Sequence, residues 1–295
     1  MPSRDNGHRM KHRIAFVKYH GCGNDFILKD EMSGQKTPDS ERSKLAIVLC
    51  DRHFSVGADG VIFIERAKSV DGSMRLFEPA GNEADMCGNG LRCVAAYLMK
   101  KSARSRVKIL TRDGVKDVVK SGANFRVDMG RVRTDPDDIR QYVTARGLPS
   151  GSTKDIVISA TGGRMRGWIV NSGEPHIVVK VRHLNELDVR GIGDSVNEDK
   201  TKFPTGVNID FVQVIGPSEI RIRTYERGVY DETLACGTGA TAAAAVAVMA
   251  KWVRSSPVKV DVAGGCISIE MAPRGSALMT GPAEEVFRGS ATVDV

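Results

Sequence analysis

Residues 85–93 read DMCGNGLRC, and residues 235–243 read ACGTGATAA. Each stretch places a cysteine directly before Gly-x-Gly, and each opens an alanine-rich segment with the composition of a helix. The strand-like stretch VKILTRDGV at Val107 is likewise matched by VKVDVAGGC at Val258. The offset is 149 residues for the cysteines and 151 residues for the strands. Landmarks that recur in the same order at nearly one offset indicate an internal duplication.

Each copy shows the same order of expected elements. A strand-like stretch, MRLFE at Met74 or IRIRTYE at Ile220, leads through a polar loop to the cysteine, the helix and further short strands. The second helix is apolar nearly all round, which is typical of a buried core helix. We therefore predict an α+β fold of two pseudo-symmetric domains, each a mostly antiparallel sheet wrapped around a central helix.

The domain boundary is expected where proline and acidic residues interrupt the pattern, in RVRTDPDD at residues 131–138. The closing segment EVFRGSATVDV follows the second copy and is expected to return to the first domain as a strand. The predicted domains are therefore residues 12–131 with 283–295, and residues 132–282.

Composition excludes several classes of protein. The chain has 295 residues, of which 41% are hydrophobic and 27% charged, and no stretch is apolar for long enough to span a bilayer. The formal charge is +7, but Lys and Arg alternate with acids and only 5% of residues are aromatic, which argues against a nucleic-acid partner. Residues 1–13 are basic and lack the apolar core of a secretory signal, so a cytoplasmic location is expected.

The cysteine pattern argues against disulfides and metal. A disulfide framework is typical of short secreted chains, and this chain has no Cys-x-x-Cys pair. The six histidines do not lie at metal-ligand spacing, so no metal site is predicted. Core packing is the expected role of four cysteines, namely Cys22, Cys50, Cys93 and Cys266.

The two remaining cysteines, Cys87 and Cys236, lie where a helix is expected to begin. The first N–H groups of a helix have no intrahelical acceptor and carry the positive end of the helix dipole. Both effects favour a thiolate, so we expect the pKa of each thiol to fall. The same N–H groups can hold a carboxylate, and the glycines allow its close approach.

Two such sites facing one cleft would hold one carboxylate from both sides. The carbon beside that carboxylate would then have a cysteine on each face, so that one thiolate removes its proton and the opposite thiol returns one. The N–H groups would stabilise the charge that develops on the carboxylate. This arrangement inverts a stereocentre without metal or organic cofactor, and no cofactor is predicted.

The motifs HGCGNDF at His20, MCGNGLRC at Met86 and ERGVYDETLACGTGA at Glu226 resemble those of the diaminopimelate epimerase family. The resemblance extends from Val17 to Gly281. It implies a cytoplasmic, cofactor-independent isomerase that converts LL-2,6-diaminopimelate to the meso form, a step toward lysine and peptidoglycan precursors. It also implies two pseudo-symmetric domains and makes a homodimer plausible.

The resemblance also implies site residues. Cys87 and Cys236 correspond to the two acid/base thiols, and His176 with Glu226 to residues that tune them. The residues that correspond to substrate-binding positions are Asn24, Gly88, Asn89, Asn208, Glu226, Arg227, Gly237 and Thr238. Among these, Arg227 matches the partner of the distal carboxylate, a task that suits a planar guanidinium.

Two departures from the family's pattern involve carboxylates. The stretch at 78–83 is EPAGNE where the family usually has Asn-Ala-Asp-Gly-Ser-Glu, and the stretch at 173–176 is GEPH where Gly-Asn-Pro-His is usual. Glu78 and Glu174 thus replace asparagines that face the substrate, and the loop from Glu226 to Cys236 is one residue longer than its commonest form. Carboxylates would favour a cationic side chain, so racemisation of Lys, Orn, Arg or His is the alternative function.

Two further alternatives remain. The stretch GTGATA at Gly237 fits a loose dinucleotide-binding fingerprint, which would indicate a nicotinamide or flavin enzyme but leaves the cysteines and the duplication unexplained. The same scaffold could also bind an amino acid without turning it over. Either carboxylate could instead lie at the surface or pair with a nearby cation, which would remove the basis for an altered substrate.

Overall fold

The structure is a computed structural model of the chain and describes residues 11–34, 36–148, 151–161, 163–254 and 256–294. The first ten residues of the basic N-terminal segment lie outside this part. The described residues up to Val118 form one compact unit together with those from Ala283 to Asp294, and the described residues of Val119–Pro282 form a second unit. Both combine a mostly antiparallel sheet with helices, which confirms the predicted α+β class.

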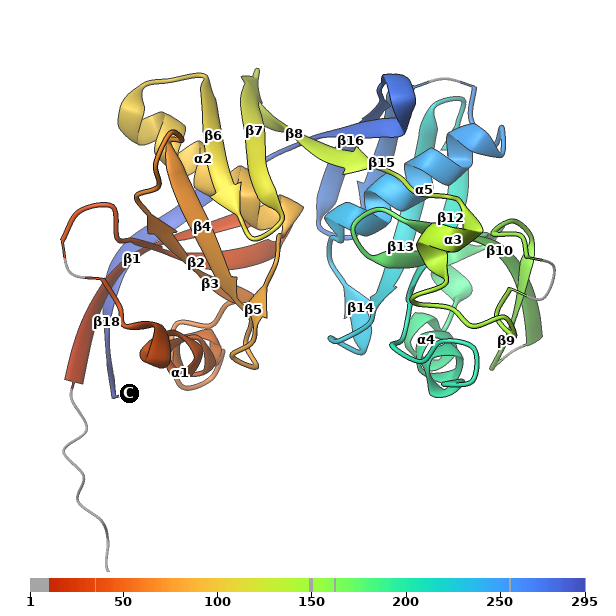
Figure 1. The fold of residues 1–295 in the computed structure, drawn as a ribbon, viewed down its shortest axis with the longest axis horizontal. Helices are drawn as coiled ribbons and strands as arrows, with labels where there is room; N and C mark the ends of the chain where they lie inside the picture. The colour runs from red at the N-terminus through yellow and green to blue at the C-terminus, as the bar shows by residue number, and fades with distance from the viewer. Residues whose placement is uncertain (1–10, 35, 149–150, 162, 255, 295) are drawn as a thin grey trace, which may run out of the picture. The chain divides into compact units, whose positions relative to one another are not determined.

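The first unit is built mainly of strands around one long helix (Figure 1). Its elements are β1 (Lys11–Gly21), β2 (Asn24–Asp30), α1 (Asp39–Cys50), β3 (Gly60–Glu65), β4 (Gly72–Phe77), β5 (Glu83–Ala84), α2 (Gly88–Ser102), β6 (Arg106–Thr111) and β18 (Glu284–Asp294), with β7 (Gly114–Ser121) running across the unit boundary. Strand β1 pairs antiparallel with β2 and with β18. The closing segment therefore returns to the first unit as a strand, as expected.

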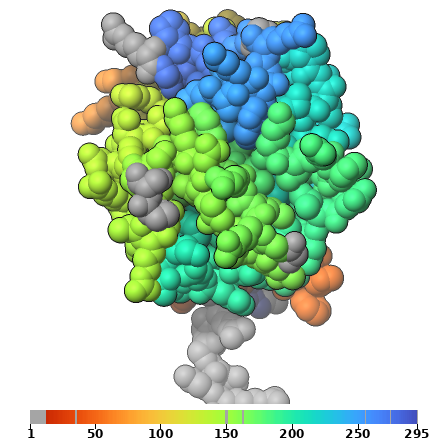
Figure 2. Space-filling view, turned by 90° about the vertical axis from the view of Figure 1, so that its right-hand side faces the viewer, coloured from red at the N-terminus to blue at the C-terminus, as the bar shows by residue number. Residues whose placement is uncertain are grey.

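The second unit repeats this plan and adds further strands. Its elements are β8 (Asn124–Arg131), α3 (Pro136–Ile139), β9 (Ile156–Ala160), β10 (Gly163–Asn171), β11 (Pro175–Lys180), η1 (Leu184–Glu186), α4 (Val189–Glu198), β12 (Asn208–Gly216), β13 (Glu219–Glu226), β14 (Asp231–Thr233), α5 (Gly237–Met249), β15 (Val258–Val262), β16 (Gly265–Met271), η2 (Pro273–Gly275) and β17 (Ser276–Gly281). Strand β8 pairs with β17, so residues 124–131 pack with this unit. Figure 2 shows the unit from the side of β9 and β10.

The strand pairings establish the duplication in three dimensions. In the first unit β2 pairs parallel with β3, β3 antiparallel with β4, β4 antiparallel with β5 and β4 parallel with β6. In the second unit β11, β12, β13, β14 and β15 pair in the same way. The two copies also share an ion pair. Arg75 on β4 pairs with Glu83 on β5, and Arg223 on β13 pairs with Glu232 on β14.

Each central helix is buried because strands pack around it. Helix α2 contacts β1, β2, β4, β6 and β18, and α5 contacts β10, β11, β12, β13, β15, β16 and β17. Most of α5 is inaccessible to solvent, as its all-round apolar sequence predicts. Cys22, Cys50 and Cys93 also lie in the core. The prediction for Cys266 was wrong, because Cys266 is exposed on β16 at the end of a hairpin.

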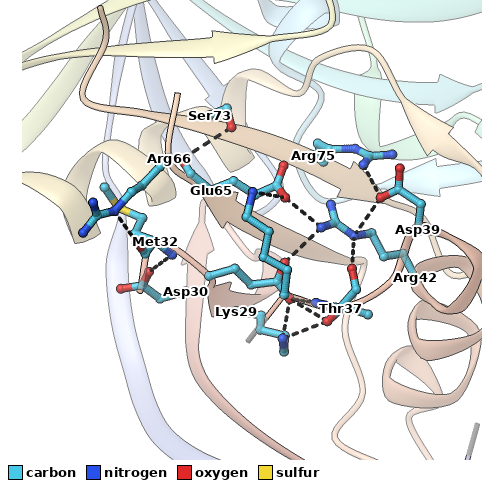
Figure 3. A network of polar contacts seen from close by, with 12 residues as sticks. Lys29, Asp30, Met32, Thr37, Asp39, Arg42, Glu65, Arg66, Ser73 and Arg75 are labelled. Carbon is cyan, nitrogen blue, oxygen red and sulfur yellow. Dashed lines mark hydrogen bonds and ion pairs between the residues drawn. The ribbon is translucent and has the colours of Figure 1, made fainter. Parts of the chain in front are cut away.

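A buried ion cluster joins α1 to the ends of β2 and β3 in the first unit (Figure 3). Arg42 on α1 is 1% exposed and donates from Nη2 to Glu31 at 3.0 Å and to Glu65 at 2.8 Å. The Glu31 carboxylate also accepts from the Thr37 backbone N–H at 2.9 Å and pairs with Lys29. Four donors therefore converge on a carboxylate that solvent does not reach.

Within the described residues, no helix combines the length and apolar character needed to cross a membrane.

Candidate active site

Cys87 occupies the position directly before helix α2. Its backbone is extended, with φ −137° and ψ 120°, and its Sγ accepts from the Gly90 backbone N–H at 3.5 Å. Regular helical bonding begins with the Leu91 N–H, which donates to the Cys87 carbonyl at 2.8 Å. The N–H groups of Gly88 and Asn89 precede the regular helical bonds, in the first turn of α2. The thiol and these N–H groups thus belong to one helix end.

The side chain of Asn24, at the start of β2, faces this helix end. Its Oδ1 accepts from the Asn89 amide at 3.1 Å and from the Cys87 thiol at 3.8 Å. Its Nδ2 donates to Asp59 Oδ2 at 2.8 Å, and Arg52 in turn donates to Asp59 Oδ1 at 2.6 Å. Because a carboxylate only accepts, Asp59 fixes the orientation of the Asn24 amide.

The buried cation Arg92 interacts electrostatically with Cys87. Arg92 on α2 is fully buried and donates from Nη2 to Asn89 Oδ1 at 2.9 Å. Burial lowers the pKa of this guanidinium, whereas the nearby thiols of Cys22, Cys93 and Cys87 act to raise it. A positive charge that interacts with a thiol favours the thiolate over the neutral thiol.

Cys236 repeats the arrangement before helix α5. Its backbone is extended, with φ −105° and ψ 114°, and its Sγ accepts from the Gly239 N–H at 3.3 Å. The Ala240 N–H donates to the Cys236 carbonyl at 2.9 Å, so the N–H groups of Gly237 and Thr238 precede the regular helical bonds. The Thr238 hydroxyl lies 3.3 Å from the Cys236 sulfur. The duplication therefore extends to the bonding of the two thiols.

The surroundings of Cys236 differ from those of Cys87 because they include a histidine and two carboxylates. His176 on β11 is fully buried, and its Nε2 lies 3.0 Å from Thr238 Oγ1. Its Nδ1 lies 2.8 Å from Asp210 Oδ2. Glu226, at the end of β13, accepts from the Thr233 hydroxyl, and its charge acts on the Cys236 thiol.

The expected fall in pKa was wrong for Cys236. Burial raises the pKa of this thiol well above its usual range, and the charges of Glu226 and Asp210 raise it further. The hydrogen bonds with Thr238 and from the Gly239 N–H act in the opposite direction, but they are the smaller effects. Burial also raises the pKa of Glu226. Desolvation thus outweighs the helix end, which sequence position alone does not reveal.

Arg227 and Glu174 form an ion pair beside this half of the site. Glu174 Oε2 accepts from Arg227 Nε at 2.8 Å and from its Nη2, while Nη1 lies 3.3 Å from the carbonyl and hydroxyl oxygens of Thr205. The guanidinium also lies over the Tyr142 ring, 5.6 Å from its centroid. The negative charge of Glu174 is therefore balanced by the adjacent Arg227 guanidinium, although the Glu174 side chain is 47% exposed.

Glu78 lies apart from the Cys87 contacts. It is exposed after β4, and its carboxylate accepts from the Asn82 amide in the same loop. Glu78 is also the counterpart of Glu226 in the second copy. Glu78 follows Phe77, which pairs with Glu83, and Glu226 follows Tyr225, which pairs with Glu232. The difference between Glu78 and the family's usual asparagine thus lies at a solvent-exposed turn in this structure.

Sequence reasoning missed three residues that support these contacts, Asp59, Arg92 and Asp210. Asp210 carried a usable signal, because it lies two residues after Asn208 and alternate strand residues share one face. Asp59 and Arg92 gave no such signal, because their contacts depend on how loops and α2 pack.

The family model described as diaminopimelate epimerase matches the chain twice, at residues 16–134 and 168–286. The chain belongs to the diaminopimelate epimerase family. The two matches correspond to the two copies in the structure, and each includes one of the helix-capping cysteines, Cys87 or Cys236.

Curated diaminopimelate epimerases match almost the full chain. The protein from Pelotomaculum thermopropionicum is 39% identical over 94% of this chain and 98% of its own length. The one from Methanothrix thermoacetophila is 38% identical over 94% of this chain and 95% of its own length. The family assignment therefore covers both copies and the segment that joins them.

Solved structures with low identity share the fold. A hydroxyproline epimerase from Agrobacterium vitis, solved with bound trans-4-hydroxy-L-proline, has a TM-score of 0.67 at 14% identity and covers 97% of this chain and 94% of its own. A phenazine biosynthesis protein from Bacillus anthracis has a TM-score of 0.66 at 14% identity and covers 96% of this chain and 100% of its own. At such identity these neighbours support the two-copy architecture alone.

Proposed function

We propose that the protein is an isomerase that epimerises LL-2,6-diaminopimelate to meso-diaminopimelate by two-base acid/base catalysis. The observation that carries this proposal is the repeated thiol: Cys87 and Cys236 each precede a buried central helix and accept from the third N–H after the cysteine. The relatives of 35–39% identity are named diaminopimelate epimerases, which favours this substrate. Racemisation of a basic amino acid is not favoured, since Arg227 neutralises Glu174.

In the proposed reaction a thiolate removes the α-proton, and the C–H electron pair is delocalised into the adjacent carboxylate. The backbone N–H groups of Gly88, Asn89, Gly237 and Thr238 are proposed to stabilise this charge. The opposite thiol then delivers its proton to the other face of the carbon, and its S–H electron pair remains on sulfur. The proposal requires the two helix ends to face one substrate.

The charged surroundings support a division of work between the thiols. The buried Arg92 guanidinium favours a thiolate at Cys87, whereas Glu226 and Asp210 favour a protonated thiol at Cys236. We therefore assign the resting base to Cys87 and the resting acid to Cys236. Asn24 and Asn208 are proposed to orient the substrate, and Arg227 to receive its distal carboxylate.

The test measures α-proton exchange from deuterated water with purified, reduced protein. LL- and meso-diaminopimelate are compared with lysine, ornithine, arginine and histidine, and the products are resolved by chiral chromatography. Exchange with inversion of diaminopimelate supports the proposal, and Cys87→Ala and Cys236→Ala should each abolish inversion. Exchange confined to a basic amino acid would refute diaminopimelate as the substrate. Tight diaminopimelate binding without exchange would indicate a binding protein.

A further inference from the structure

A buried carboxylate, Asp210 on β12, contacts the Cys236 half of the site without contacting the thiol directly. Asp210 is fully buried, and Asn208, on the same face of the strand, is 3% exposed. Asp210 Oδ2 lies 2.8 Å from His176 Nδ1, and Oδ1 accepts from the Thr224 hydroxyl at 2.8 Å. Burying a carboxylate is costly unless its oxygens are hydrogen-bonded, and both oxygens have a partner here.

The surrounding hydrogen bonds determine which nitrogen of His176 carries the proton. The Arg227 backbone N–H can only donate, so the Asn208 atom that receives it at 2.8 Å is Oδ1. The Asn208 Nδ2 group therefore lies 3.2 Å from His176 Nε2 and donates to it. Nε2 must then be unprotonated, and the single proton of a neutral ring is on Nδ1, directed at Asp210.

The same reasoning orients the hydroxyl of Thr238. The contact of 3.0 Å between Thr238 Oγ1 and His176 Nε2 is a hydrogen bond, and because Nε2 carries no hydrogen the Thr238 O–H is its donor. It shares the single Nε2 lone pair with the Asn208 amide. The Thr238 oxygen can then only accept on the side of Cys236, whose sulfur lies 3.3 Å away. The contacts thus form one directed chain from the Cys236 thiol through Thr238 and His176 to Asp210.

We propose that Asp210 is a positioning residue that holds His176 with its proton on Nδ1, so that Thr238 and His176 can receive the proton of the Cys236 thiol. In this step the S–H bond breaks and its electron pair stays on sulfur. The proton passes to the Thr238 oxygen while the Thr238 hydroxyl proton passes to Nε2. The products are a thiolate and an imidazolium whose charge lies against Asp210.

The chain allows a buried thiol to ionise without adding net charge to the site. A thiolate formed by losing its proton to water would add one negative charge beside Glu226 and Asp210, which desolvation strongly disfavours. Transfer along the chain leaves the summed charge of Cys236, His176 and Asp210 unchanged. Glu226 on β13 faces the same thiol and opposes ionisation with or without the chain.

The experiment measures ionisation of Cys236 by its alkylation, so it needs no amino-acid substrate. The background is Cys87→Ala with Cys266→Ser, which removes the partner thiol and the exposed thiol. The full-length folded protein is treated with iodoacetamide between about pH 6 and about pH 10, and modification of the Cys236 peptide is followed by mass spectrometry. Because the readout is independent of turnover, failure to epimerise diaminopimelate would refute the proposed function and leave this proposal testable.

Asp210→Asn should slow alkylation at neutral pH by about tenfold or more and move the rise in rate to higher pH. His176→Asn should do the same, and the double variant should be no slower than either single variant, since Asp210 acts through His176. A packing role alone would loosen the site and accelerate alkylation. Unchanged or faster alkylation in Asp210→Asn would overturn the proposal. So would a double variant whose fold-reduction in alkylation rate equals the product of the two single reductions.

A second pair of variants tests the chain if Asp210→Asn does not fold, as judged by circular dichroism. Thr238→Val keeps the shape of the side chain and removes the hydroxyl, so it should slow alkylation as Asp210→Asn does. Thr238→Ser restores a hydroxyl and should restore the rate. Equal alkylation rates in the valine and serine variants would also overturn the proposal.

Discussion

Replacing Glu31 by Gln should destabilise the first unit strongly, although Glu31 is distant in sequence from Cys87 and Cys236. The Glu31 side chain is 0% exposed, and its carboxylate accepts from Thr37 and Arg42 and pairs with Lys29. Glutamine keeps one acceptor oxygen but directs an N–H₂ group at donors. Arg42 then retains two carboxylates that solvent reaches, Glu65 with a side chain 14% exposed and Asp39 with a side chain 72% exposed.

The structure sets the size of the effect. Breaking a buried ion pair by removing one partner costs about 3–5 kcal/mol. Because glutamine preserves one acceptor and Glu65 remains, we expect the lower end, about 3 kcal/mol, which is roughly a 150-fold change in the folding equilibrium. The control is Asp117→Asn, which breaks a pair with Arg106 whose side chains are 33% and 66% exposed. Such surface pairs contribute at most about 1 kcal/mol.

Urea unfolding of both variants, followed by far-UV circular dichroism and by tryptophan fluorescence, measures this loss. Trp168 and Trp252, the two tryptophans of the chain, both lie in the second unit, so fluorescence reports that unit and circular dichroism reports both. If the two units unfold independently, circular dichroism should show the loss of stability in Glu31→Gln while the fluorescence transition stays unchanged. A loss below about 1 kcal/mol by circular dichroism, equal to that of Asp117→Asn, would refute the claim that burial makes this cluster costly to disrupt.

Three further outcomes are expected. Arg227→Lys should raise the KM for diaminopimelate about tenfold with little change in kcat, because an ammonium cannot present the fork of a guanidinium; an unchanged KM in steady-state assays would exclude the proposed contact. The hydrogen bond from Arg288, with those from Lys100 and Tyr19, lowers the pKa of Glu285 from 4.5 to about 2. Its contribution to stability is therefore complete above pH 4.5 and lost as pH falls toward about 2, so Tm values of wild type and Glu285→Gln should converge over that window. Burial raises the pKa of the Cys50 thiol to about 12, so mass spectrometry should find Cys50 unmodified by iodoacetamide at about pH 8 until urea unfolds the protein.

Local patterns predicted much of each half-site. A cysteine before Gly-x-Gly and an apolar helical stretch led to Cys87 and Cys236 at helix N-termini, and the structure has both there. The order of landmarks predicted two similar sheets, each around a central helix. Such features depend on backbone geometry and hydrophobic periodicity, which neighbouring residues determine.

The electrostatic character of each half-site depended on the tertiary structure. The two motifs are nearly alike, yet Cys87 lies near the buried Arg92 cation and Cys236 lies near Glu226 and Asp210. Ionisation depends on burial and on charges within a few ångströms, and residues from β11, β12 and β13 supply these around Cys236 only after folding. For the same reason the sequence alone could suggest that Glu174 alters the substrate, whereas the fold places it on Arg227. Sequence by itself therefore determined where the two thiols lie, and only the packing of distant strands decided how readily Cys236 can lose its proton.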